Sequence, residues 1–397
     1  MARFRPLVVG ATIIALAALM SACTPAASSP TPTVSPTPSE SVGPVVDRPE
    51  PVFSVACDDL VDSRELQSFI GSGVAAITLL DPADRVLTVT PDEAARDQIG
   101  SLVCDWNDGQ EPASPWGPPP DPRQSVRLSL VADAEEAAQR YVDTYASAEV
   151  DTPYGPTAQG PRCIGIDDAM PTGYCELHGW LSNAWIDFTV SGLITDGYES
   201  DAELLDAFMV FTDEVVATLD DVETTEAWVP PVSPNPVSDC ASVLTTDDIV
   251  ELTGITNVFV GPSYDGPRIG QYWYAADTEQ AMRCSFNFRD AEGWFGAAHV
   301  LPEGAWGFAT ASPTWLADGG EASDVTGLEA GDAVMRCADP ADTCTLDMRV
   351  AGHWIRVEVM PPPPADVGYV PAGIDFDAAR AAVVPIAERV VANITAA

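Results

Sequence analysis

Nine cysteines carry the most specific chemistry in this 397-residue sequence, because a thiol can form a disulfide or ligate a metal. No Cys-x-x-Cys pair occurs, and the spacings do not suit zinc. Setting Cys23 aside leaves 9 − 1 = 8 cysteines, a number that can pair fully. The cysteines after residue 50 are therefore predicted to form four disulfides.

Acidic pairs are further candidates, since two close carboxylates can act as general acid and base. Neighbouring aspartates occur at Asp58-Asp59, Asp167-Asp168, Asp220-Asp221 and Asp247-Asp248. They fall near expected helix ends, where carboxylates complement the helix dipole, so capping is the favoured interpretation. A hidden carboxylate pair of the glycosidase kind stays open as the alternative.

The basic residues exclude several reaction types. All 18 are arginine, so a Schiff-base lysine and a phosphate-loop lysine are impossible. The three histidines, His178, His299 and His353, would have to converge from both halves of the chain to bind zinc. We therefore expect neither a metal site nor a cofactor.

Aromatic residues crowd into the second half of the chain and give the one binding hypothesis that side-chain types suggest. As a groove, they would accept a lipid, a glycan or a partner peptide. The alternative is that they form core, because aromatic side chains bury large areas. The residues concerned are Tyr272, Trp273, Tyr274, Trp294, Trp306 and Trp315.

The elements that would position these residues occur twice. Cys57 precedes Gly71 by 14 residues and Cys240 precedes Gly254 by 14. In the same way, Trp185 follows Cys175 by ten residues and Trp354 follows Cys344 by ten. We infer a domain duplication, because the offset between the copies is too long for a solenoid repeat. Trp185 and Trp354 are predicted to be core residues under the closing helix of each copy.

The duplication also selects a disulfide pairing, although four cysteines in each half allow three connectivities. The expected pairs are Cys57–Cys104 and Cys163–Cys175 in the first half, and Cys240–Cys284 and Cys337–Cys344 in the second.

Hydrophobic periodicity predicts short helices and strands joined by turns. Residues 125–131 alternate, with Leu128 on one face and Arg127 on the other, which is typical of a strand. Residues 201–219 carry an apolar stripe typical of a helix. Strands are expected at 85–90, 102–106, 283–288 and 297–301, hairpins at 174–190 and 348–359, and further helices at 63–70, 134–146, 246–252 and 377–394, the last kinked or started late by Pro385. The predicted fold class is α+β, with two tandem duplicated domains that each have an antiparallel sheet and helices packed on one face.

The net charge of the chain restricts the kinds of molecule that it can bind. The formal net charge is −42, or −42 − 2 = −44 without Arg3 and Arg5, and such a chain repels nucleic acid. With 46% hydrophobic residues the chain can bury real cores.

The N-terminal segment predicts export. Arg3 and Arg5 precede an apolar run from Leu7 to Met20 and the small residues Ser21 and Ala22, which is the order of a secretory signal. The run is shorter than the about 20 apolar residues that a bilayer of roughly 30 Å requires. A Ser/Thr/Pro-rich stretch follows and favours an extended tether.

This N-terminus resembles that of the bacterial lipoproteins, whose signal ends in small residues before a cysteine. The resemblance implies that Cys23 takes a thioether-linked diacylglycerol and becomes the mature N-terminus, with ordinary secretion as the alternative. The partner would then be the lipid bilayer, and the chain would lie on the extracytoplasmic face of the cell membrane. The expected division is a signal at 1–22, a tether at 23–52, domains at 53–226 and 238–397, and a Pro-rich linker at 227–237.

The two halves are similar to small disulfide-bonded domains of unknown function in actinobacterial lipoproteins. That resemblance implies an α+β fold and an envelope role, and it transfers no catalytic residue. The leading hypothesis is a non-catalytic envelope protein that binds a ligand or partner. A hydrolase of cell-wall polymers and a structural spacer are the alternatives. A pocket with two close carboxylates would favour the enzyme, and an apolar groove without them would favour binding.

Overall fold

The computed structural model describes residues 48–70, 77–81, 84–86, 89–108, 124–145, 153–166, 172–262, 269–289, 293–337, 343–360 and 375–396. The predicted signal, Cys23, the tether as far as residue 47 and the pair Asp167-Asp168 lie outside these residues. The described residues of both halves belong to a single compact unit. The domain and linker boundaries given above stay predictions.

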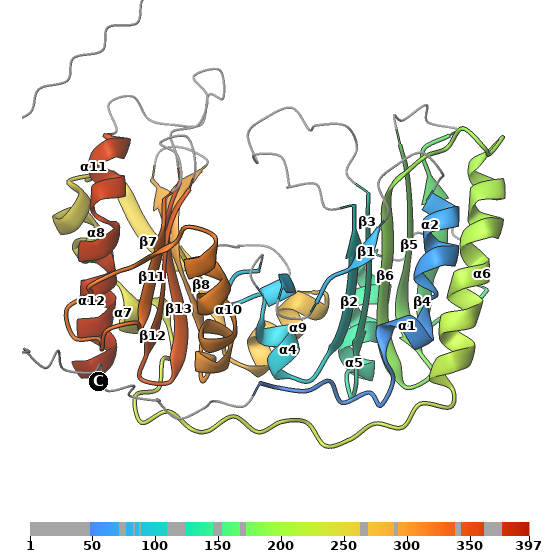
Figure 1. The fold of residues 1–397 in the computed structure, drawn as a ribbon, viewed down its shortest axis with the longest axis horizontal. Helices are drawn as coiled ribbons and strands as arrows, with labels where there is room; N and C mark the ends of the chain where they lie inside the picture. The colour runs from blue at the N-terminus through green and yellow to red at the C-terminus, as the bar shows by residue number, and fades with distance from the viewer. Residues whose placement is uncertain are drawn as a thin grey trace, which may run out of the picture. The chain divides into compact units, whose positions relative to one another are not determined.

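The first half contains an antiparallel sheet with the strand order β1-β2-β3-β6-β5-β4 in the part of the chain that the structure describes (Figure 1). The β5–β6 hairpin turns at Ser182 and Asn183, whose φ angles of 49° and 61° belong to the tight turns that match strand twist. The strands are β1 Thr78–Leu79, β2 Leu102–Asn107, β3 Ser125–Val131, β4 Ala158–Ile164, β5 Gly173–Leu181 and β6 Ala184–Leu193.

The second half repeats this arrangement in the order β10-β11-β12-β13-β9-β8-β7, so its strands pair as those of the first sheet do, with β10 added at one edge. The predicted hairpin turn at Ala351 and Gly352 has φ angles of 50° and 94°. The strands are β7 Val258–Pro262, β8 Met282–Phe288, β9 Trp294–Leu301, β10 Glu321–Ala322, β11 Ala333–Arg336, β12 Cys344–Val350 and β13 His353–Val359. The α+β class with two sheet-containing halves is confirmed.

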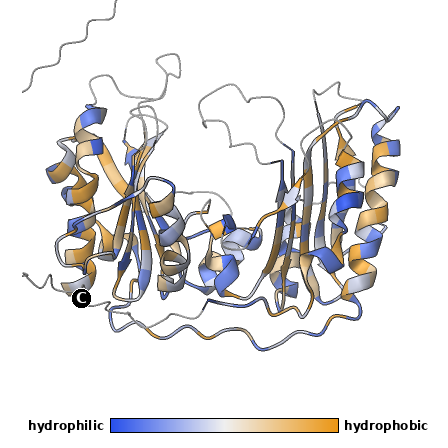
Figure 2. Cartoon of the chain, viewed as in Figure 1, coloured by the Kyte–Doolittle hydropathy of each residue, from blue (hydrophilic) through white to orange (hydrophobic). Residues whose placement is uncertain are grey.

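A closing helix covers one face of each sheet (Figure 1). Leu204, Phe208 and Val215 of α6 Asp201–Leu219 are fully buried against the first sheet. Ile386 and Val390 of α12 Val383–Ala396 do the same on the second. Figure 2 shows apolar and polar residues interleaved along the strands of both sheets, as expected when one face of a sheet packs on a helix. The predicted 377–394 helix is two helices, α11 Phe376–Ala381 and α12, which agrees with the late start expected from Pro385.

Helices also lie on the opposite face of each sheet, which the prediction of helices on one face did not include. α5 Glu135–Tyr145 packs over the first sheet and α10 Ala305–Ala317 over the second. Trp185 and Trp354 are buried as predicted, but they lie on this opposite face and not under the closing helices. The physical reason is strand alternation: Ile186 and Ile355, one residue further on, occupy the face under the closing helix.

One predicted strand is wrong. Arg85 and Val86 lie in a helical turn, and Val86 and Val89 are buried together against the second half. Their i, i+3 spacing suits a helical turn better than a strand. The remaining helices are α1 Cys57–Leu60, α2 Ser63–Ile70, α4 Ala95–Gln98, α7 Cys240–Val243, α8 Thr246–Thr253 and α9 Gln271–Thr278.

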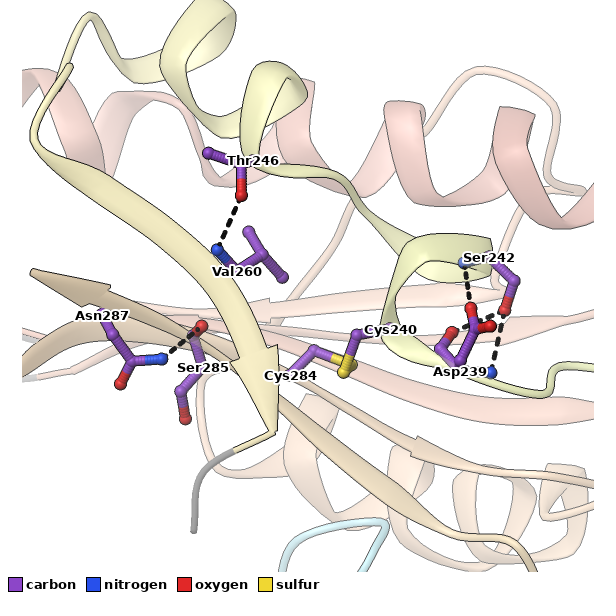
Figure 3. Close-up of a disulfide and its surroundings, with 8 residues drawn as sticks. All are labelled: Asp239, Cys240, Ser242, Thr246, Val260, Cys284, Ser285 and Asn287. Carbon is purple, nitrogen blue, oxygen red and sulfur yellow. Dashed lines mark hydrogen bonds between the residues drawn. A yellow bond between two sulfur atoms is a disulfide. The ribbon is translucent and has the colours of Figure 1, made fainter. Parts of the chain in front are cut away.

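All four predicted disulfides are present. Cys57–Cys104 joins α1 to β2, and Cys240–Cys284 joins α7 to β8 at the corresponding place (Figure 3). Cys163–Cys175 links β4 to β5, whereas Cys337–Cys344 links the end of β11 to the start of β12. Four disulfides indicate an oxidising, extracytoplasmic environment.

Each half contributes an equivalent segment that packs on the other half, and we call these the exchanged segments. Residues 89–98, which include α4, pack in one cluster with Trp306 and Trp354 of the second half. Tyr274 of α9 packs in another with Trp185 of the first half. A glutamine fastens each segment: Gln98 donates to the Pro302 carbonyl at 2.8 Å, and Gln271 donates to the Trp185 carbonyl at 2.7 Å. Each segment immediately precedes the strand that is second from one sheet edge, β2 or β8, so the exchange follows from the duplication.

Candidate ligand-binding site

The face of the first sheet turned away from α6 carries charged and polar residues. Asp105 on β2 lies opposite Arg127 on β3, and Arg127 lies opposite Thr189 on β6. Their strand neighbours Cys104, Leu128 and Phe188 point into the core under α6. Alternation along three adjacent strands therefore gathers these polar side chains on one surface.

A pocket of about 410 Å³ lies on this surface. The exchanged segment 89–98 forms one wall, and β2, β3 and β6 form another. Its volume falls within the range of small-molecule sites. The lining residues are Leu80, Val89, Glu93, Arg96, Asp105, Trp106, Asn107, Ser125, Val126, Arg127 and Thr189.

Two ion pairs organise the charges at the pocket. Arg127 donates to Asp105 through Nε, with 2.6 Å between Nε and Oδ1. Burial opposes the charge of Arg127, but the attraction and hydrogen bond of Asp105 raise its pKa. Arg85 pairs with Asp97 of α4, and its Nε lies 3.9 Å from Asp105. Both aspartates are thereby matched to arginines.

Arg96 lies close to these arginines but, within the described residues, has no carboxylate within 4.0 Å. Its residue is 8% exposed, and its Nε is buried without a hydrogen-bond partner among the described residues. Burial lowers the pKa of Arg96 and the nearby Arg127 and Arg85 lower it further, while the charges of Asp105 and Asp97 oppose this shift only in part. A buried cation without a carboxylate partner is energetically unfavourable, so this side chain marks the pocket as a site.

The second half keeps the fold without these charges. Ser285 follows Cys284 just as Asp105 follows Cys104, and Ser285 lies opposite Ala297 where Asp105 lies opposite Arg127. Two sheets of the same strand order therefore carry an ion pair and an uncharged pair at the same place. The architecture does not require Asp105 and Arg127.

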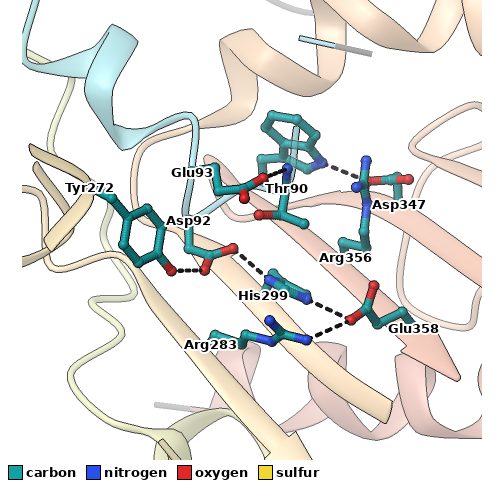
Figure 4. A network of polar contacts seen from close by, with 10 residues as sticks. Thr90, Asp92, Glu93, Tyr272, Arg283, His299, Asp347, Arg356 and Glu358 are labelled. Carbon is teal, nitrogen blue, oxygen red and sulfur yellow. Dashed lines mark hydrogen bonds and ion pairs between the residues drawn. The ribbon is translucent and has the colours of Figure 1, made fainter. Parts of the chain in front are cut away.

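His299 belongs to a second buried network (Figure 4). Its Nδ1 lies 2.5 Å from Asp92 and its Nε2 lies 3.0 Å from Glu358. Burial opposes the imidazolium, but the two carboxylates raise the pKa of His299 to about 9. Burial also opposes ionisation of Asp92 and Glu358, and His299 nevertheless holds both of their pKa values below the ordinary range. Both ring nitrogens of His299 are engaged and 1% of the residue is exposed, so His299 cannot serve as a general base. It holds Asp92 and Glu358 together, and we call these three residues the His299 clasp.

His178 is held in a similar way on the first sheet. Its Nε2 lies 3.1 Å from Glu176 and its Nδ1 lies 3.2 Å from Asp187. Burial disfavours the charged ring, while these carboxylates raise the pKa of His178 to about 9. The third histidine, His353, accepts a hydrogen bond from the Glu303 amide and lies within bonding distance of the Asn235 carbonyl. In the part of the chain that the structure describes, no group of three His, Cys, Asp or Glu side chains is placed to hold a metal ion.

The aromatic residues suggested as a groove lie in separate places. Trp306 and Trp315 are 0% and 3% exposed and belong to the core beside α10, which is the alternative stated for them. Tyr272 contacts Trp273, and its hydroxyl donates to Asp92.

The other two suggested aromatics are half-buried elsewhere. Arg283 covers the ring of Trp294 at 4.2 Å. Tyr274 packs against Trp185 and lines a smaller pocket of about 270 Å³. The six residues therefore do not share one groove.

The acidic pairs in the described region lie at helix ends. Asp248 forms a capping box with Thr245 at the start of α8. Asp58 and Asp59 lie in the first turn of α1, and Asp220 caps the end of α6, where it accepts a hydrogen bond from Ser182. None of these pairs lines the pocket.

The pocket residues were missed at the sequence level, although Arg127 was placed on the polar face of its strand. Arg85, Arg96 and Asp97 give no local signal, since their partners lie on other elements. A usable hint was the rarity of basic residues: 18 among 397, with three of them meeting at this surface.

Comparisons with known proteins add little to this geometry. The chain matches no family model and no curated protein. Among solved structures, it is similar to the crystal structure of DynU16, a protein of the dynemicin biosynthetic locus, with 12% identity over 82% of this chain and 98% of that one and a TM-score of 0.14. A likeness at this level carries no argument about fold or function. No helix among the described residues has both the length and the apolar character needed to cross a membrane.

Proposed function

We propose that this chain is a lipid-anchored extracytoplasmic protein that binds a small ligand, without converting it, in the pocket on the polar face of the first sheet. The lipoprotein-like N-terminus supports the anchor through Cys23. The four disulfides support the compartment.

The observation that carries the binding role is the difference between the two copies. Asp105 and Arg127 stand where the second copy has Ser285 and Ala297, in sheets of the same order. Because the fold forms without this ion pair, ligand recognition is the better explanation for it. An unpaired buried Arg96 beside it is the kind of departure from stability rules that functional sites show.

The same carboxylates argue against an enzyme. Asp105 is bound to Arg127, and Glu93 accepts the Thr90 amide at 2.9 Å. Because protein groups hold both carboxylates in place, we assign them a positioning role in the pocket and not an acid–base role. The presence of the pocket argues against the third alternative, a structural spacer that binds no ligand.

Binding can be tested with a variant that fills the pocket. Thr189 lines the pocket from β6 and is half-buried, so Thr189→Phe places a ring in the cavity. We expect at least one compound from a panel of envelope sugars, muropeptides, amino acids and organic acids to raise the melting temperature of the wild-type chain. The same compound should leave Thr189→Phe unchanged. If no compound at millimolar concentration stabilises the wild type, or if the variant responds equally, the pocket is not the ligand site.

The anchor is tested separately by the intact mass of the chain from the membrane fraction of its host. A diacylglyceryl-sized gain that disappears in Cys23→Ala would support lipidation. A soluble product without added mass would contradict it.

A further inference from the structure

We infer that the ligand of this pocket carries an oxyanion, either a carboxylate or a phosphate, which pairs with the guanidinium of Arg96. This inference rests on the proposed function and adds the chemical class of the ligand. Three observations carry it: the burial of Arg96, the pairing of the charges around it, and the size of the cavity that it lines.

Arg96 is enclosed by protein and lacks a counter-ion. The residue is 8% exposed, its Nε has no hydrogen-bond partner, and within the described ranges no carboxylate lies within 4.0 Å of it. Removing a charged group from water costs several kcal/mol unless an opposite charge compensates. The position is therefore prepared for a negative group that the free chain does not supply.

The two aspartates near Arg96 already pair with other arginines. Asp97 pairs with Arg85, and Asp105 pairs with Arg127. Glu93, the other carboxylate on the pocket wall, accepts a backbone amide. Three arginines, Arg85, Arg96 and Arg127, therefore stand beside three carboxylates, Asp97, Asp105 and Glu93, and within the described residues Arg96 is the arginine of this set that forms no ion pair within 4.0 Å.

The geometry of a guanidinium suits an oxyanion. Its planar array of N–H groups matches two oxygens of a carboxylate or phosphate, and such charge-assisted pairs are strong when water is excluded. The half-buried side chain of Arg127 lies on the same pocket and could contact a second oxygen. A volume of about 410 Å³ limits the ligand to a small molecule or to one group of a larger one.

The test uses the mature, disulfide-bonded chain with three probes at matched ionic strength: inorganic phosphate, benzoate and its neutral analogue benzamide. We expect phosphate or benzoate to bind at least tenfold more tightly than benzamide by calorimetry. Phosphate and benzoate distinguish the two sources of the oxyanion. Equal binding of benzoate and benzamide, or binding of none of the three, would overturn the inference.

Arg96→Met supplies a second readout that does not depend on ligand choice. Methionine keeps much of the side-chain volume and removes the unpaired charge, so the ligand-free variant should melt at a higher temperature than the wild type while losing at least tenfold in anion affinity. Arg127→Gln is the matched control, because it breaks an existing pair with Asp105 and should lower the melting temperature. If Arg96→Met is destabilised as Arg127→Gln is, Arg96 has a structural partner and the inference is wrong.

The two proposals can fail independently. A neutral compound that stabilises the wild type but not Thr189→Phe, without any oxyanion binding, would keep the binding function and reject the oxyanion. Failure of every compound in both experiments would reject both.

Discussion

His299 and Asp92 are 207 residues apart in the chain, and their side chains meet at 2.5 Å in the interior. The contact joins β9 of the second sheet to the exchanged segment of the first half. That segment also bears Arg96, so the clasp positions one wall of the pocket.

His299→Gln should lower the free energy of unfolding by about 3–5 kcal/mol, since it leaves Asp92 buried without its cation, while Glu358 keeps its pair with Arg283. Urea denaturation measures the change. Glu251→Gln is the control, because the Glu251 side chain is 67% exposed in its pair with Arg389 and should contribute less than about 1 kcal/mol. Equal losses in the two variants would show that the clasp is not a buried ion pair.

Stability should be greatest in mildly acidic solution. His178 and His299 have pKa values raised to about 9, so their contribution is complete below the ordinary histidine pKa of about 6.5 and is lost as pH rises through about 9. Glu176 has a pKa lowered to about 2, so its contribution is complete above the ordinary value of about 4.3 and is lost as pH falls toward 2. The melting temperature should therefore be highest between about pH 5 and 6.5.

Loss of stability between pH 7 and 9 should be smaller in His299→Gln than in the wild type. An identical slope for the two proteins over that interval would contradict the assignment of His299.

Gly307→Ala should destabilise the chain by about 1–3 kcal/mol through overpacking. A Cβ at Gly307 of α10 would lie 2.5 Å from Cε3 of Trp354, a fully buried ring that cannot move away. Gly197→Ala is the control, because a Cβ there meets nothing within 4 Å. Thermal unfolding of the two variants gives the comparison, and a neutral Gly307→Ala would show that the α10 interface is loose.

Removing the long-range disulfide should cost more than removing the short one. The double serine variant of Cys57 and Cys104, which close a loop of 47 residues, should lose about 4 kcal/mol in the chain-entropy description. The variant of Cys337 and Cys344, with a separation of 7, should lose about 2 kcal/mol. Denaturation under non-reducing conditions measures both, and the reverse order would mean that chain entropy does not control their contributions.

Much of the fold was predictable because the repeat supplied a second copy of each local signal. Helix α6 begins at Asp201 and ends at Leu219, as its apolar stripe predicts. The repeated spacing also led to all four disulfides. Where the pattern was short the prediction failed, as at Arg85 and Val86. Val86 and Val89 lie three residues apart, which suits a helical turn, and both are buried in one cluster with residues of the second half.

The two halves also differ in the charged residues that they carry at equivalent positions, which hydrophobic periodicity does not predict. His178 lies opposite Asp187 on β5 and β6, while Asp347 lies opposite Arg356 on β12 and β13, so the same cross-strand ion pair has its charges reversed. Either order satisfies a buried pair. The repeated spacing already makes these positions equivalent, because His178 and Asp347 each lie three residues after a cysteine of the repeat, and the register adds which residue each one faces.

The amino-acid sequence by itself determined the α+β class, the paired cysteines and the closing helices, because these depend on residue spacing within one element or one copy. Tertiary structure decided which half each exchanged segment packs on, and therefore where Arg96 lies. Gln98 bonds to Trp306 across 208 residues. A contact of that range depends on the shapes of two folded surfaces, which no local period encodes. The candidate site could therefore be recognised only after the chain was folded.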